Sequence, residues 1–218
     1  MTPGEPLVRW DWVASHLPDI AQRLGEHVML AGIAVGVGTL VSLAVGIYVA
    51  RRPRLYAPVS WLAGVLYTIP SLALFALLIP FTGLTLLTAE IGLVSYTLLI
   101  LIRNVAVGIR AVPAEVRETA LAMGYTPRQL LWRVELPLAL AVIVAGVRVA
   151  TVTTIGLTTV TALIGQGGLG FFILDGIQLF FATPLIVGAT CSVALAVIAD
   201  AGLVLVQRAA TPWARAGG

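Results

Sequence analysis

The residues from Glu118 to Pro137, ETALAMGYTPRQLLWRVELP, gather charged side chains in a chain that has few of them. Only 11% of the 218 residues are charged, whereas 59% are hydrophobic. Glu118, Arg128 and Arg133 can form charge-assisted hydrogen bonds with a partner. The stretch is therefore either a plain connector between buried segments or a surface built for another molecule.

Two further ionisable residues, Arg148 and Asp200, lie within long apolar runs. A charge in such a run is costly and is usually paired or functional. At about 1.5 Å per helical residue, the two side chains fall at a similar depth. The sequence predicts a buried Arg–Asp pair, which either ties two helices together or takes part in gating.

A glycine-rich segment satisfies the pattern G-x-G-x-x-G with Gly165, Gly167 and Gly170, and it also contains Gly168. This pattern indicates dinucleotide binding only between a strand and a helix of a βαβ unit. Here it follows an apolar run, so we reject cofactor binding. We expect a flexible outer turn near the mouth of a transport pathway.

Five residues are candidates for lining such a pathway. Pro70 and Ser71 interrupt an apolar run, and broken helices often border transport routes. Tyr67, Phe75 and Tyr96 could offer aromatic faces to a cationic ligand. Packing in the core is the alternative for the aromatic rings, and a simple kink is the alternative for Pro70.

The elements that position these residues are membrane-spanning helices. The mean hydropathy is +1.02, and residues 55–89, 149–174 and 176–199 contain no charged residue. About 20 apolar residues span a bilayer. We predict an all-α integral membrane protein with five spans, at about residues 28–50, 56–80, 87–109, 137–164 and 184–206.

Arginine placement predicts the orientation, because cytoplasmic segments carry an excess of positive charge. The segments on one side hold Arg51, Arg52, Arg54, Arg103, Arg110, Arg117, Arg128, Arg133, Arg208 and Arg215, and those on the other hold only Arg9 and Arg23. We expect the N-terminus outside and the C-terminus in the cytoplasm. Residues 1–27 are predicted to form an amphipathic segment outside, 28–210 the transmembrane domain and 211–218 a cytoplasmic tail.

The charged stretch would then lie in the cytoplasm, within a loop at about residues 113–136. Pro113 can begin a short helix, and Gly124 suits its left-handed end. Thr126 and Gln129 have the spacing of a capping box that begins a second helix. Pro137 suits the first turn of the following span.

These residues resemble the signature (EAA) loop of ABC importer permeases, in which Glu-Ala-Ala, Gly, Ile and Leu-Pro occur at this spacing. The matching positions are Glu118, Thr119, Ala120, Gly124, Val134, Leu136 and Pro137, with Thr119 and Val134 departing from the pattern. The strings YTIPSLALFALLIPFTGL and TALIGQGGLG further resemble permeases for glycine betaine, choline and carnitine. Methionine permeases have a similar glycine-rich turn.

The resemblance implies a type I, methionine-permease-like fold in a prokaryotic cell membrane. It also implies that the loop contacts a cytoplasmic ATPase. The expected partners are two cytoplasmic ATPase subunits, a second permease chain that is identical or homologous, an extracytoplasmic substrate-binding protein and the lipid bilayer. ATP and Mg²⁺ would bind the ATPase, not this chain.

Several functions find no support in the residues. Enzyme motifs, a metal-ligand cluster and a nucleic-acid-binding pattern do not stand out, and Cys191 has no second cysteine with which to pair. Two alternatives stay open. One is an ABC permease for methionine or another amino acid, and the other is an ion-coupled secondary transporter, which the small number of membrane acids disfavours.

Overall fold

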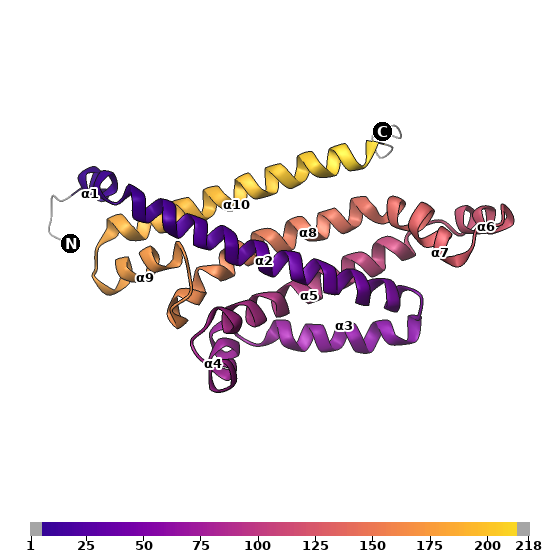
Figure 1. The fold of residues 1–218 in the computed structure, drawn as a ribbon, viewed down its shortest axis with the longest axis horizontal. Helices are drawn as coiled ribbons and strands as arrows, with labels where there is room; N and C mark the ends of the chain where they lie inside the picture. The colour runs from indigo at the N-terminus through magenta and orange to yellow at the C-terminus, as the bar shows by residue number, and fades with distance from the viewer. Residues whose placement is uncertain (1–5, 213–218) are drawn as a thin grey trace. The chain divides into compact units, whose positions relative to one another are not determined.

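A computed structural model describes residues 6–212, and the regular elements in that range are all helices (Figure 1). The elements are α1 (Trp10–Ser15), α2 (Leu17–Ala50), α3 (Pro53–Thr68), α4 (Ser71–Thr82), α5 (Leu86–Arg110), α6 (Ala114–Ala122), α7 (Pro127–Leu130), the π-turn η1 (Leu131–Glu135), α8 (Leu136–Thr158), the 3₁₀ turn η2 (Val160–Ile164), α9 (Gly170–Gln178) and α10 (Ala182–Ala210). Arg215 and the predicted tail beyond residue 212 lie outside the described residues, as do residues 1–5.

Four helical runs are long and apolar enough to cross a membrane, namely α2, α5, the run Pro127–Thr158 and α10. The pair α3 and α4 passes the same test together as one bent segment. These helices match the predicted spans in number and approximate place, so the predicted all-α membrane fold is confirmed.

The second predicted span, however, is not one helix across residues 56–80. The chain bends by 94° between α3 and α4. Pro70 has extended backbone angles (φ −56°, ψ 134°), and its carbonyl accepts the first bond of α4 from the Leu74 N–H at 2.9 Å. Because proline has no N–H to continue α3, the break falls here.

The first span also differs from the prediction. Residues 17–27 belong to α2, which continues to Ala50 without interruption, so they are not a separate surface segment. Only the six-residue α1 stands apart, and its end at His16 marks the change of direction. Arg9 anchors α1, since its backbone N–H donates to Thr183 Oγ1 at 3.0 Å.

The helices pack as two compact units. The first unit consists of the residues up to Gly36, Ile69–Val94 and Thr151–Ala199. Its apolar core is formed by fully or nearly fully buried side chains of α2, α4, α5 and η2: Leu30, Ala34, Phe75, Ala89, Leu93 and Ile164. The bent segment α4 thus belongs to this core through Phe75.

The second unit consists of Val37–Thr68, Ser95–Ala150 and the residues from Asp200 onward. Its core joins α5 to α8 through Val105, Ile109, Ala139 and Ile143. A neighbouring cluster of Val49, Ile102 and Ala106 packs against α3 residues such as Tyr56 and Val59. This unit holds the whole loop between α5 and α8.

Candidate functional site

The loop between α5 and α8 contains two short helices joined by a tight turn at Gly124. Gly124 has φ +84°, in the left-handed region that glycine adopts without strain. The N–H of Gly124 donates to the Leu121 carbonyl at 2.9 Å, and the N–H of Tyr125 donates to the Ala120 carbonyl at 3.1 Å. This is a Schellman ending for α6, and it fixes the angle at which α7 follows.

The second helix begins with the predicted capping box. Thr126 Oγ1 accepts the Gln129 N–H at 3.3 Å, and the Thr126 N–H donates to Gln129 Oε1 at 2.8 Å. Pro127 occupies the first turn, where its missing N–H costs nothing. The local sequence therefore determines both ends of the turn.

The expected break before the fourth span is absent. Helical structure runs from Pro127 to Thr158, so α7 continues through η1 into α8, and Pro137 does not begin a new helix. In a regular α-helix the Pro137 ring would clash with the carbonyl of Arg133. The wider π-turn η1, closed by the Leu136 N–H and the Leu131 carbonyl, lies just before the proline and lets the helix continue.

The signature residues divide between the surface and the interior. Glu118, Thr119 and Gly124 are exposed. Ala120 is only 2% exposed because its side chain packs inside the unit. Val134, Leu136 and Pro137 are half-buried.

Beside the signature residues, α6 presents a shallow apolar groove of about 310 Å³, lined in part by Val116, Met123 and Val134. Met123 is 65% exposed. The exposed charges Glu118, Arg128 and Arg133 form no ion pair with any residue in the range 6–212. This face thus offers both apolar contact and unpaired charge.

Glu135 is a functional candidate that the sequence reasoning missed. Its side chain is 8% exposed and accepts from Arg51 Nη2 and Arg117 Nε, each at 3.1 Å. Arg51 Nη2 also donates to the Pro127 carbonyl at 3.1 Å, and Arg117 donates to the Ile109 carbonyl. One buried carboxylate therefore ties the end of α2, α6 and η1 together.

Arg148 and Asp200 form the predicted ion pair. The guanidinium binds the carboxylate at two points, Nε to Oδ1 at 2.8 Å and Nη2 to Oδ2 at 2.9 Å. Gln207 Nε2 donates to the Ala141 carbonyl at 3.1 Å and its Oε1 lies 3.4 Å from Arg148 Nη1. The pair is half-buried rather than buried, with side chains 30% and 35% exposed, so it links α8 to α10 at an accessible face of the chain.

The pathway candidates are divided between the two units, with Pro70, Ser71 and Phe75 in the first and Tyr67 and Tyr96 in the second. Tyr67 and Tyr96 pack edge to face at 5.8 Å, but Tyr96 is only 5% exposed. Phe75 is fully buried in the core of the first unit, so its ring cannot line a path. Pro70 and Ser71 form the bend between α3 and α4.

The glycine-rich turn is packed, which corrects the expectation of a flexible turn. Gly167, Gly168 and Gly170 are buried, although Gly165 is exposed. A side chain at Gly168, which has φ +46°, would collide with the Arg23 carbonyl and His27 of α2. This close backbone contact holds the segment before α9 against α2. The helix α9 was not predicted from the sequence.

The long apolar helices and the exposed helix pair are features expected of a membrane-embedded permease. This chain belongs to the family of binding-protein-dependent transport system inner membrane components, which matches residues 42–211. The resemblance noted from the signature loop is therefore confirmed, and the chain is a transport subunit.

Named relatives cover nearly the whole chain. The choline transport system permease protein OpuBB of Bacillus subtilis is 36% identical over 194 residues, 89% of each chain. The osmoprotectant import permease protein OsmW of Salmonella typhimurium is 37% identical over 198 residues, 88% of this chain and 92% of that protein. In fold, a chain of the inward-facing MetNI methionine ABC transporter aligns with a TM-score of 0.81 at 24% identity, over 90% of this chain and 98% of that one.

Removing the buried carboxylate should loosen the loop. We expect Glu135→Ala to lower the unfolding free energy of the detergent-solubilised chain by about 1–3 kcal/mol, because Arg51 and Arg117 lose a shared acceptor. Glu118→Ala removes the same charge from an exposed site without an ion pair and serves as the control. An unfolding midpoint for Glu135→Ala equal to that of the control would show that the contacts of Glu135 with Arg51 and Arg117 do not stabilise the fold.

Proposed function

We propose that the chain is the permease subunit of an ABC importer for quaternary-ammonium osmoprotectants, such as glycine betaine, choline and carnitine. The similarity to choline and osmoprotectant permeases over nearly nine-tenths of the chain carries this proposal. The methionine transporter shares the fold at lower identity and so supports the mode of transport, not the substrate.

In this proposal the exposed face formed by α6, α7 and η1 docks on a cytoplasmic ATPase subunit. Its shallow groove and the unpaired Glu118, Arg128 and Arg133 supply apolar contact and charge-assisted hydrogen bonds. ATP and Mg²⁺ bind the ATPase, and this chain hydrolyses nothing. The arginine-rich segments, including this loop, face the cytoplasm, and the N-terminus lies outside.

The link to the membrane is mechanical. Since α7 continues through η1 into α8, a push on the docked helices moves the fourth span directly. Glu135 adds the end of α2 to the same body through Arg51. ATP-driven closure of two ATPase subunits would thus rock the spans between inward-facing and outward-facing states.

Two further partners complete the importer. An extracytoplasmic binding protein delivers the substrate, and a second permease chain, identical or related, frames the pathway. The apolar side chains of α10 suit a second chain or lipid, since Val193, Val197 and Ile198 are all exposed on this subunit.

Reconstituted uptake tests the substrate and the energy source together. In liposomes that contain this chain, its ATPase and its binding protein, we expect choline or glycine betaine uptake that requires internal ATP. Uptake by this chain alone under an ion gradient would mean a secondary transporter. ATP-dependent import of methionine but of no quaternary ammonium compound would favour the amino-acid alternative.

The turn at Gly124 provides a matched test of coupling. Gly124→Val forces a β-branched residue to φ +84°, whereas Gly124→Asn places there a residue that tolerates this region. We expect the valine variant to insert normally and retain ATP hydrolysis but lose most uptake, and the asparagine variant to retain most of it. Charge reversal in Glu118→Arg should uncouple in the same way.

Normal uptake by both Gly124→Val and Glu118→Arg would contradict docking through this loop. Membrane-inserted protein must be quantified for each variant, so that a loss of uptake is not a loss of protein.

A further inference from the structure

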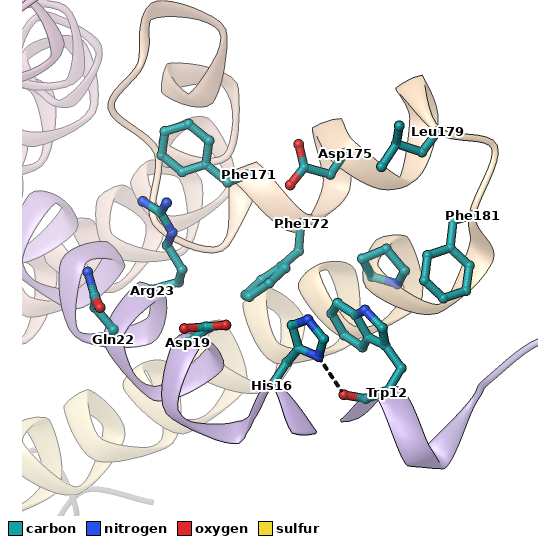
Figure 2. Close-up of a pocket in the computed structure, with 11 residues that line it drawn as sticks. Trp12, His16, Asp19, Gln22, Arg23, Phe171, Phe172, Asp175, Leu179 and Phe181 are labelled. Carbon is teal, nitrogen blue, oxygen red and sulfur yellow. Dashed lines mark hydrogen bonds between the residues drawn. The ribbon is translucent and has the colours of Figure 1, made fainter. Parts of the chain in front are cut away.

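The first unit contains a cavity of about 390 Å³, and none of the signature residues lines it. It lies between the N-terminal helices α1 and α2 on one side and α9 with the start of α10 on the other (Figure 2). This volume falls in the range of small-ligand sites. In the orientation proposed above, the cavity faces the outside.

Aromatic rings form much of the wall. The Trp12 indole packs edge to face on Phe172 and on Phe181, with 5.9 Å between ring centroids in each pair. The indole also stacks on the His16 ring, with 4.1 Å between the ring centroids. His16 Nδ1 donates to the Trp12 carbonyl at 2.8 Å. The rings are thus held in place before any ligand arrives.

Two carboxylates flank these rings. Figure 2 shows Asp19 extending from α2 and Asp175 from α9, with Phe172 between them. Neither carboxylate forms an ion pair or a side-chain hydrogen bond with a residue in the described range 6–212. Both are exposed and free to meet a cation.

Arg23 lines the cavity, but its positive charge is already paired. Arg23 Nη1 lies 2.9 Å from Glu26 Oε2, and the guanidinium lies 4.2 Å from the centroid of Phe171. Asp19 and Asp175 therefore leave the cavity negative. Aromatic faces combined with negative charge are the surroundings in which proteins bind quaternary ammonium groups.

We propose that this cavity binds a trimethylammonium group, separately from the central pathway. The identity of the biological ligand rests on the proposed function. The preference of the cavity for a cation follows from Trp12, Asp19 and Asp175. The bound cation contacts the Trp12 and Phe172 rings, and the two carboxylates balance its charge.

Equilibrium binding of radiolabelled choline to the purified full chain in phosphatidylglycerol nanodiscs tests the proposal. We expect saturable binding of the radiolabel. Unlabelled choline should displace it, whereas the uncharged carbon isostere of choline, 3,3-dimethylbutan-1-ol, should not. Trp12→Leu and Asp175→Asn should each weaken binding by about tenfold. Trp10→Leu, an exposed tryptophan of the same helix, should have no effect.

Asp175→Asn protects the test against misfolding, because this exposed side chain holds no partner that folding would miss. No binding by the wild-type chain, or equal binding by Asp175→Asn and the wild type, would overturn the proposal. Competition by the uncharged isostere as strong as by choline would also overturn it.

Two additional experiments are needed. The first distinguishes a lipid headgroup from a free solute as the ligand, and the second distinguishes failure of the cavity proposal from failure of the proposed function. Loss of choline binding in phosphatidylcholine nanodiscs would identify a lipid headgroup as the ligand, and equal binding would identify the free solute. Choline binding by the chain, with no uptake of any quaternary ammonium compound by the assembled importer, would support the cavity proposal and contradict the proposed substrate class. Uptake by the assembled importer without choline binding by the chain would contradict the cavity proposal and support the proposed substrate class.

Discussion

The continuity of the helix across Pro137 is the constraint on which the proposed coupling depends. A proline inside a helix removes one hydrogen bond and crowds the preceding turn, and a simple break there would leave the loop hinged to the membrane domain. The π-turn η1 widens the backbone just before the proline, so the helical run from Pro127 to Thr158 stays whole. Because α7 is the end of this continuous helix, a displacement of α7 would be transmitted to the fourth span without a further linkage.

Side-chain contacts then tie neighbouring elements to this helix. Glu135 lies in η1 itself and joins Arg51 at the end of α2 to Arg117 of α6, while Gly124 fixes the turn between α6 and α7. In the first unit, close backbone packing has a similar role. The buried glycines that follow η2 bring α9 against α2, and this contact places Phe171 and Phe172 beside the N-terminal helices.

What the sequence predicted well depends on neighbours only a few residues away. The capping box of Thr126 and Gln129 and the left-handed Gly124 follow from local spacing, and the spans follow from long apolar runs. Glu135 was missed because one of its partners, Arg51, is 84 residues distant, and no local pattern marks such a pair. Pro137 suggested a helix start because the residue type alone cannot tell a first turn from a π-turn. For Phe75 the sequence left a pathway role and core packing both open, because burial depends on tertiary contacts, and the structure shows the ring in the core.

The central claim is that α7 and the fourth span move as one body, and a spin-label distance tests it directly. Labels at Arg128→Cys on α7 and Val149→Cys on α8, both exposed, with Cys191 replaced by serine, would lie about 30 Å apart along the helix. In the assembled importer we predict the same distance distribution in the nucleotide-free and ATP-bound states. A shift of several ångströms on ATP binding would show a hinge between the two helices and contradict the account.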